Sequence, residues 1–206
     1  MPPTLQKKEW CAFLYELKFR CGRGIVGIRK GAEDMIRRAA AADIPAVCDI
    51  YEEIHAREEA GISAVGWVRG VYPTRDTVVS ALAADELFVL ERDGQVVAAA
   101  RINRTQGEEY AQVRWSMDAP PEQVMVMHTL AVSPAAMGTG LGRQFLTFYE
   151  EYARQQGCPF LRIDTNERNT YARKLYRRLG YQEAGIVSCV FNGIGGVRLV
   201  CLEKNL

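Results

Sequence analysis

The chain has 206 residues, of which 48% are apolar, and its formal net charge is +1 at pH 7. This is enough apolar material to bury one hydrophobic core, so a single domain is expected. The near-neutral charge argues against a nucleic-acid partner or a membrane surface, and any recognition of charge must be local.

Residues 1–34 differ from the rest of the chain. The stretch EWCAFLYELKFRCGRG predicts a short amphipathic helix with Trp10, Phe13 and Leu17 on one side, and glycines then break any regular element. Charged residues interrupt the apolar run that a signal peptide would need. We expect 1–34 to be an extension, with Met35 as an alternative natural start, and 35–206 to be the functional domain.

The segment from Met35 to Leu82 predicts one strand followed by two helices. The strand opens at Met35, and apolar residues then recur at helical spacing over 43–60, with Asp43 as the expected N-cap. Residues 61–72 are irregular. A second helix follows, with Thr74 as its expected cap.

The middle of the chain predicts three strands. The stretch ELFVLERDGQVVAAARI has two apolar runs around Asp93-Gly94, a dipeptide that favours a tight hairpin turn. Residues 105–123 are polar, and we expect 110–115 to extend the sheet. Residues 124–132 are apolar on both faces, which is typical of a central, covered strand.

The last third predicts two helices and three strands. The helices are 141–157 and 172–179, the second ended by Gly180, and the strands are 159–165, 181–191 and 197–203. The order is β-α-α-β-β-β-α-β-α-β-β. It predicts an α/β (α+β) fold, with a mixed sheet and helices on both faces.

The six cysteines form no metal or disulfide framework, because no C-x-x-C occurs and the nearest pair is ten residues apart. Reduced thiols and no bound metal are therefore expected. The longest uncharged run, 123–142, contains Pro134 and three glycines, so it does not predict a membrane span. The chain is expected to be soluble and cytoplasmic.

Three alternate glycines follow the apolar strand 124–132, in the stretch LAVSPAAMGTGLGRQFL. Gly138, Gly140 and Gly142 lead into a helix, whose N-terminal N–H groups are unpaired and carry partial positive charge. Without side chains, a phosphate can approach those groups closely. A tight strand-to-helix joint is the alternative explanation for the three glycines. The spacing fits neither a P-loop nor the dinucleotide-binding G-x-G-x-x-G.

This stretch resembles the acetyl-CoA-binding motif of the GNAT superfamily of N-acetyltransferases. A second stretch, NTYARKLYRRLGY at 169–181, resembles that family's N-x-x-A-x-x-L-Y-x-x-L-G-F/Y motif, and both stand in the expected order. The resemblance covers about 35–206. It implies a mostly antiparallel sheet splayed open around a coenzyme A cleft, and acetyl-CoA as the co-substrate.

The resemblance also implies which residues bind the coenzyme. The pantetheine arm would pair with the backbone of Leu130, Ala131 and Val132, as an added strand does. Asn169 would hydrogen-bond the coenzyme, cap the following helix, or do both. The pyrophosphate would lie on the N–H groups of a six-residue turn, namely Gly138, Thr139, Gly140, Leu141, Gly142 and Arg143.

Two features bear on the strength of that binding. Met137 occupies the position where the family prefers Arg or Gln, and it offers a phosphate no charge or hydrogen bond. The basic run around the last predicted helix carries a local charge of +4. Some of its side chains would reach the 3′-phosphate, although such runs are usually solvated helix faces.

Acetyl transfer to an amine needs a neutral amine, a stabilised oxyanion and a proton for the departing thiolate. Tyr176 resembles the family's general acid, and a phenol of pKa about 10 protonates a thiolate only roughly 2 kcal/mol uphill. Tyr176 also lies on an apolar stripe, so packing is its alternative role.

His128 is the candidate base, since an unperturbed imidazole suits neutral pH, and a core histidine is the alternative. Glu52, Glu53 and Glu58 are rival bases.

The predicted acceptor is the amine of a small molecule, amino acid or peptide, attacked directly through a tetrahedral intermediate. No nucleic-acid or membrane partner is expected, and a homodimer is compatible with the sequence. The other hypotheses are a non-catalytic acyl-CoA-binding module and a Rossmann-type nucleotide binder. Five residues are expected to line the acceptor side: Trp67, Arg69, Tyr72, Trp115 and Phe191.

Overall fold

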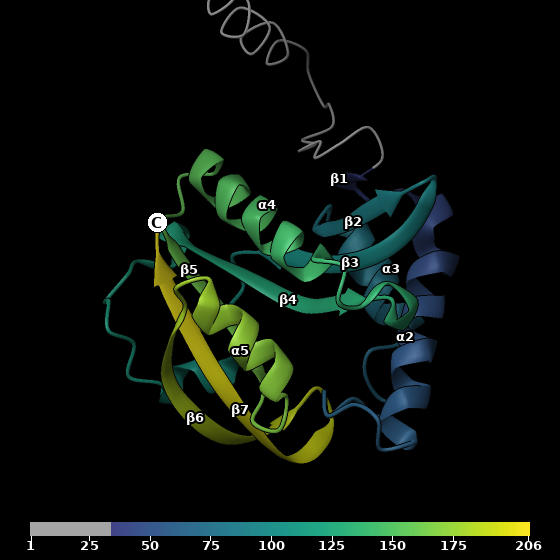
Figure 1. Cartoon of the computed structure of the whole chain (residues 1–206). Helices are drawn as coiled ribbons and strands as arrows, with labels where there is room; N and C mark the ends of the chain where they lie inside the picture. The colour runs from purple at the N-terminus through teal and green to yellow at the C-terminus, as the bar shows by residue number, and fades with distance from the viewer. Residues whose placement is uncertain (1–33) are drawn as a thin grey trace, which may run out of the picture.

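The computed structural model describes residues 34–206, so the predicted N-terminal extension and its helix lie outside the described part of the chain. Seven strands form one sheet in the order β1-β2-β3-β4-β5-β7-β6, and every neighbouring pair is antiparallel except β4–β5 (Figure 1). The strands are β1 (Asp34–Arg38), β2 (Leu87–Arg92), β3 (Gln95–Asn103), β4 (Val124–Val132), β5 (Phe160–Asn166), β6 (Gln182–Phe191) and β7 (Ile194–Asn205). The predicted mixed, mostly antiparallel sheet is confirmed.

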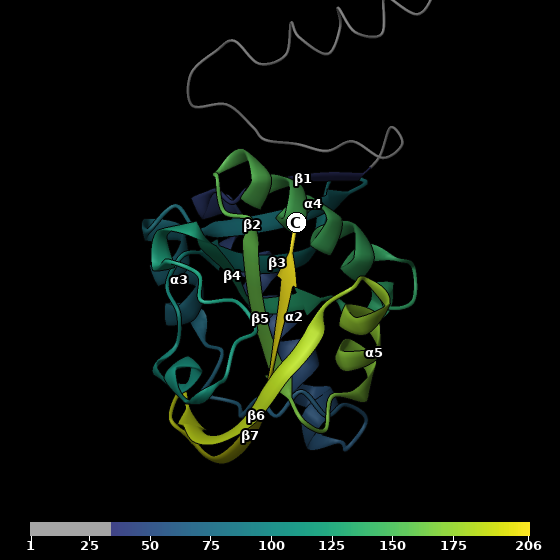
Figure 2. The same cartoon turned by 90° about the vertical axis from the view of Figure 1, so that its left-hand side faces the viewer.

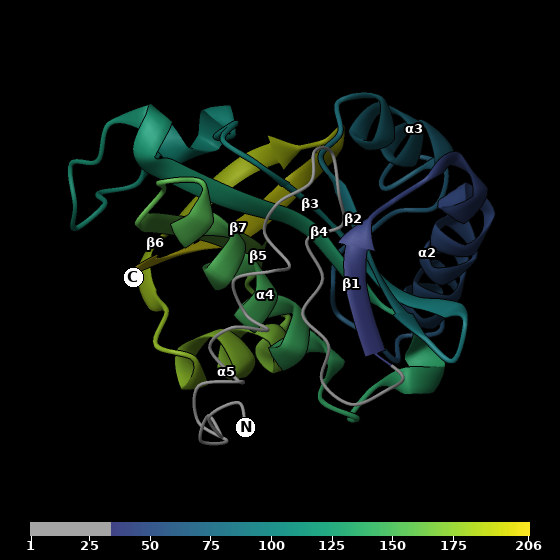
Figure 3. The ribbon, with the colours of Figure 1, turned by 90° about the horizontal axis from the view of Figure 1, so that it is seen from above.

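Helices cover both faces of the sheet, as the sequence predicts. The helices α2 (Ile44–Glu59) and α3 (Arg75–Ala83) bury their apolar residues in one cluster against β2 and β3. The helices α4 (Leu141–Gln155) and α5 (Thr170–Arg178) contribute to a larger cluster on the other face. Figures 1 and 3 show the two pairs on opposite sides.

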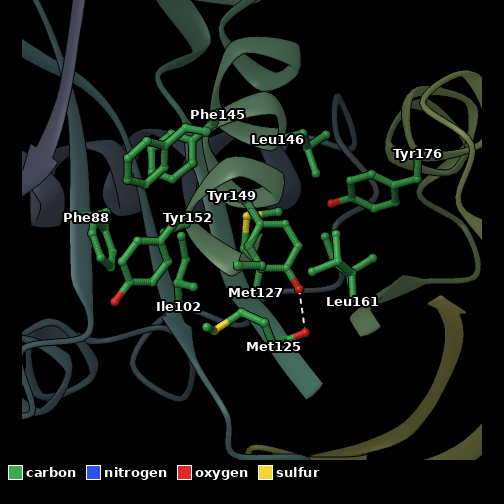
Figure 4. Packing of buried hydrophobic residues seen from close by; sticks show 14 of the residues in the cluster. Phe88, Ile102, Met125, Met127, Phe145, Leu146, Tyr149, Tyr152, Leu161 and Tyr176 are labelled. Atoms are coloured by element: carbon green, nitrogen blue, oxygen red, sulfur yellow. Dashed lines mark hydrogen bonds between the residues drawn. The ribbon is translucent and has the colours of Figure 1, made fainter. Parts of the chain in front are cut away.

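The larger cluster is rich in aromatic rings from α4. Phe148 and Tyr152 lie parallel with ring centroids 5.9 Å apart, and Phe88 of β2 packs against both. The buried Tyr149 hydroxyl donates to the Met125 carbonyl oxygen at 2.6 Å (Figure 4), and the Arg162 carbonyl oxygen lies 3.1 Å from the same hydroxyl. These contacts fix α4 over β4 and β5. Tyr176 lies at the edge of this cluster.

Local sequence signals account for most element boundaries. The hairpin β2–β3 turns at Asp93 and Gly94, both of which have positive φ. The helix α4 ends just before Gly157, which also has a positive φ. The expected capping by Asp43 is not observed. Its carboxylate forms no cap hydrogen bond to α2 and instead accepts the Ala40 N–H and pairs with Arg37.

The expectation that residues 110–115 extend the sheet is wrong. Residues Glu108–Gln112 form a short 3₁₀ helix, and the side chain of Tyr110 in this helix is buried. The Trp115 indole N–H donates to the Tyr110 carbonyl oxygen at 3.1 Å. This segment covers a third apolar cluster formed by β4 and the long hairpin β6–β7, which curves away from the rest of the sheet in Figure 2.

None of the helices between residues 34 and 206 is long and apolar enough to cross a membrane. The cysteines of this part of the chain, at positions 48, 158, 189 and 201, are all unpaired.

Candidate active site

The sheet separates between β4 and β5. The two parallel strands pair from Val124 with Phe160 to Met127 with Ile163, and no pair follows along the rest of either strand. His128 and Asp164 are the first residues beyond the last pair. A cleft of about 680 Å³ opens there, lined by the ends of both strands, the loops after α2 and β4, α5 and the tip of the β6–β7 hairpin.

A bulge in β4 lies at the wall of this cleft. Ala99 pairs with Ala131 and Arg101 pairs with His128, so an advance of two residues along β3 corresponds to three residues along β4. As a result, Thr129 and Leu130 have no partner in either described neighbouring strand. Thr129 has φ of 55°, an uncommon conformation for a β-branched residue. Its hydroxyl is hydrogen-bonded to that of Tyr72. Backbone groups in this part of β4 are therefore available to a ligand.

The glycine turn opens α4 at one end of the cleft. Gly138 and Gly140 have φ of +79° and +89°, a conformation that favours glycine, and a Cβ at either would meet only open space. The first N–H groups of α4, those of Leu141, Gly142 and Arg143, have no preceding helical carbonyl to bind. The turn thus presents several donors and the positive end of a 15-residue helix dipole.

Four arginines of the described chain line the cleft. Arg57, Arg143 and Arg178 line it and form no ion pair with any described residue, while Arg168 lies 3.5 Å from Glu58. Within the basic run, Arg173 is paired with Glu183 (2.9 Å). The cleft therefore has unpaired cationic side chains that suit a polyanion.

Asn169 caps α5, and its side chain accepts the Ala172 N–H at 3.1 Å. The expected capping of this helix by Asn169 is therefore confirmed. Asn169 also lines the cleft.

Tyr176 projects from α5 into the cleft and is otherwise buried. Its hydroxyl forms no hydrogen bond within residues 34–206. Burial and the negative charge of Asp164 both raise its pKa above the usual value, so the phenol remains protonated at neutral pH. It is a proton donor with no protein acceptor.

The pKa of the His128 imidazole differs from the unperturbed value that the sequence analysis assumes. Burial lowers its pKa to about 4, so the imidazole is neutral at pH 7. Its Nε2 lies 3.0 Å from the Asn103 Oδ1 and 3.1 Å from the Thr105 carbonyl oxygen. Because a carbonyl oxygen only accepts, Nε2 carries the hydrogen and Nδ1 is the nitrogen able to take a proton.

Asp164 is a site residue that the sequence reasoning missed. It lines the cleft, accepts a hydrogen bond from the Tyr110 hydroxyl at 2.8 Å, and has its pKa raised by burial to about 6. It is the one carboxylate among the described lining residues of this cleft. An acidic residue within the apolar run LRIDT was the available signal.

Of the five residues expected on the acceptor side, three aromatic residues line the cleft and the other two do not. Trp67, Tyr72 and Phe191 line the cleft. Arg69 lies outside it and pairs with Glu52 and Glu59. Trp115 also lies outside, where its ring stacks on the Arg162 guanidinium at 4.0 Å.

The rival glutamates do not line the cleft. Glu58 accepts the N–H groups of Val65 and Gly66 and holds the loop after α2. Glu53 binds the Ser133 hydroxyl. These contacts indicate structural roles for both glutamates.

The structure gathers most of the sequence-predicted site residues around one cavity. Two of them do not line it: Ala131 is buried against α2, and the Thr139 hydroxyl donates to the Ala136 carbonyl oxygen within the turn. The predicted residues that do line it are His128, Leu130, Val132, Gly138, Gly140, Leu141, Gly142, Arg143, Asn169 and Tyr176.

Comparison with known proteins agrees with this geometry. Residues 48–181 match the model of the acetyltransferase (GNAT) family. The Bacillus subtilis (strain 168) protein YhfO, an uncharacterized N-acetyltransferase, is 24% identical over 151 residues, which are 72% of this chain and 89% of that protein.

Solved structures share the fold. A GNAT-family acetyltransferase from Streptococcus agalactiae 2603 has a TM-score of 0.71 and 26% identity, covering 84% of this chain and 95% of that one. The Salmonella typhimurium protein yncA, solved with its cofactor acetyl-CoA, has a TM-score of 0.62 and 20% identity, with 84% and 94% covered.

Proposed function

This chain belongs to the acetyltransferase (GNAT) family and is an acyltransferase, and on that premise we propose that it acetylates the nitrogen of a small-molecule, amino-acid or peptide amine. Acetyl-CoA supplies the acetyl group as an activated thioester. The observation that carries the proposal is the cleft itself. One cavity brings together an open strand edge, a glycine turn at a helix N-terminus and a protonated tyrosine.

The coenzyme side of the cleft fits three parts of acetyl-CoA. The unpaired edge of β4 from Leu130 to Val132 can hydrogen-bond an amide-containing arm as an added strand would. The turn 138–143 offers backbone N–H groups to a pyrophosphate. The unpaired Arg143 and Arg178 offer charge to the phosphates, which compensates for Met137.

Tyr176 is the proposed general acid. When the amine nitrogen bonds to the thioester carbon, a tetrahedral intermediate forms, and its collapse breaks the carbon–sulfur bond. The Tyr176 hydroxyl then gives its proton to the departing thiolate. Burial keeps the phenol protonated at neutral pH, but it also makes the proton harder to give up. The thiolate in the same cleft is poorly hydrated too, so its own affinity for a proton rises and offsets part of this cost.

His128 is the proposed proton acceptor, acting after the attack. A base whose conjugate acid has a pKa of about 4 cannot efficiently deprotonate an ammonium ion in solution. Bonding to the carbonyl carbon makes the nitrogen N–H strongly acidic, and Nδ1 of the neutral imidazole can then accept that proton. The first proton of the ammonium passes to water before the attack.

The test combines coenzyme binding with turnover. Calorimetry should show that the full chain binds acetyl-CoA, and a panel of amines should release free thiol. Tyr176→Phe should lower kcat by about 10²-fold or more and leave the acetyl-CoA Kd nearly unchanged. The matched control is Tyr181→Phe, whose buried ring lies 6.1 Å from that of Tyr176. Its kcat should stay near the wild-type value.

Two outcomes would contradict the proposal. Binding without thiol release from any amine would favour the acyl-CoA-binding module. Unchanged turnover of Tyr176→Phe across the pH range would remove Tyr176 from the mechanism.

A further inference from the structure

A single carboxylate stands where the sheet divides. Met127 and Ile163 form the last pair of β4 and β5, and Asp164 is the next residue on β5. The Asp164 charge reaches two tyrosines, since it raises the pKa of both Tyr176 and Tyr72. The carboxylate is therefore near both the proposed acid and Tyr72, and all three residues line the cleft.

No cation of the described chain neutralises this carboxylate. Its one hydrogen bond comes from the neutral Tyr110 hydroxyl, which donates to Oδ2, and Asp164 forms no ion pair with the arginines that line the cleft. Burying an unpaired carboxylate raises the free energy of the folded protein, because no cation replaces the water that the carboxylate loses. A cation that enters the cleft would remove this cost.

Beside Asp164 is an aromatic wall, defined here as Trp67, Tyr72 and Phe191, which line the cleft, with the buried Tyr51 packed behind Trp67. Successive rings meet edge to face, with centroids 5.7, 6.4 and 5.9 Å apart. The wall joins α2 to the tip of the β6–β7 hairpin, and the apolar Ile194, Val197 and Leu199 of β7 continue the lining. Burial raises the pKa of Tyr72 to about 12, so the wall is uncharged at neutral pH.

We infer that the Asp164 carboxylate binds the ammonium group of the acceptor, and that the acceptor is a primary amine on an apolar or aromatic body with no carboxylate beside the nitrogen. This inference rests on the proposed function. The ammonium supplies the missing countercharge, and the aromatic wall packs against the body. A carboxylate next to the nitrogen would face Asp164 as a like charge. Arg69 is held outside the cleft by its glutamates, and none of the arginines that line the cleft is paired with Asp164.

Two classes of acceptor fit this description. One is a free amine, and the other is the amino end of a peptide, whose neighbouring carbonyl is uncharged. Their shared feature is a cation on an apolar body.

The experiment titrates the CoA-loaded full chain with 2-phenylethylamine in a calorimeter. Asp164→Asn keeps the side-chain shape and an acceptor for Tyr110, and it should raise the Kd at least tenfold. Glu109→Gln is the matched control, because Glu109 is a nearby carboxylate that does not line the cleft. Its Kd should stay within about twofold of wild type.

Three further ligands refine the result. Phenylalanine, which adds the carboxylate, should bind at least tenfold more weakly than 2-phenylethylamine. The uncharged 2-phenylethanol should bind weakly and respond little to Asp164→Asn. Phenylalaninamide separates the two classes: tighter binding than 2-phenylethylamine indicates a peptide amino end, and weaker binding indicates a free amine.

The inference is overturned if 2-phenylethylamine does not bind, binds no better than 2-phenylethanol, or binds Asp164→Asn equally well. Preference for phenylalanine would also overturn it. Failure of the wild-type chain to bind CoA would instead count against the proposed function, and the same titrations without CoA would still decide the role of Asp164.

Discussion

Leu175 of α5 lies so close to Gly142 of α4 that a Cβ atom at Gly142 would be only 3.1 Å from the Leu175 Cδ2. Gly142 therefore has a packing role besides its place in the turn 138–143, which we propose binds the pyrophosphate. It lets the two helices approach each other next to Tyr176, the residue that follows Leu175. The position of the proposed acid thus depends on a glycine that belongs to the coenzyme motif.

Gly142→Val should push α5 away from α4 and displace Tyr176. We expect overpacking to cost about 1–3 kcal/mol of stability, and kcat to fall at least tenfold. Leu175→Ala removes the contacting methyl groups, so the double variant should recover part of the lost kcat. Thermal unfolding and thiol-release kinetics on the three variants test this. No recovery in the double variant would show that Gly142 acts only through the coenzyme.

Gly140→Val should abolish measurable acetyl-CoA binding. Gly140 has φ of +89°, and its Cβ direction is open space at the mouth of the turn, so a branched side chain would occupy the space proposed for the pyrophosphate. Gly157→Val is the matched control, since Gly157 has φ of +70°, equally open surroundings and no place in the cleft. Both variants should lose similar stability, and only Gly140→Val should lose coenzyme affinity. Normal binding by a folded Gly140→Val would refute the phosphate cradle.

The Asp164 carboxyl should reduce stability at neutral pH. Its folded-state pKa of about 6 lies above 3.8, the ordinary pKa of an aspartate carboxyl, so the folded protein favours the protonated form. The penalty is absent below pH 3.8, grows as pH rises, and is complete above pH 6, where it amounts to roughly 3 kcal/mol. Asp164→Asn should therefore gain stability over wild type between pH 4 and pH 7. Urea unfolding at several pH values measures this difference, and a constant difference would contradict the prediction.

His128 should have the opposite pH dependence. Its folded-state pKa of about 4 lies below 6.5, so the folded protein favours the neutral imidazole. That contribution is fully present above pH 6.5 and is lost as pH falls towards 4, by roughly 3 kcal/mol. His128→Gln should remove this loss, so its stability should fall less steeply below pH 6.5 than that of wild type. Equal slopes would show that the imidazole is not buried in its neutral form.

The same variant tests the base. His128→Gln should shift or abolish the acid limb of the pH–rate profile if His128 accepts the proton. An unchanged limb near pH 6 would point to Asp164 as the titrating group.

The order of elements could be predicted from the sequence because local signals determine it. Turn residues such as Asp93-Gly94 and Gly180 end elements regardless of tertiary contacts, and periodic apolar residues reveal the buried faces. Residues 110–115 misled the prediction because their apolar residues serve long-range contacts. Tyr110 reaches Asp164, 54 residues away in the chain. No local pattern carries that information.

The glycine turn and the helix cap that we propose for the coenzyme could be predicted as local structures for the same reason, since each is contiguous in sequence. The acceptor side could not. Asp164 gains its significance from Tyr72, Tyr110 and Tyr176, which come from three separate segments. Likewise, only the folded chain shows that Arg69 is paired with Glu52 and Glu59 and does not face the cleft.

The parallel ladder between β4 and β5 runs only from Val124–Phe160 to Met127–Ile163, so few backbone hydrogen bonds join the two halves of the sheet. A coenzyme bound beyond this ladder would contact both halves and hold them together. Amide hydrogen exchange along Leu130–Val132 would then slow when acetyl-CoA binds, and the melting temperature would rise with its concentration. Bound acetyl-CoA would thus stabilise the fold of the enzyme that consumes it, and that stabilisation would be lost when the coenzyme leaves.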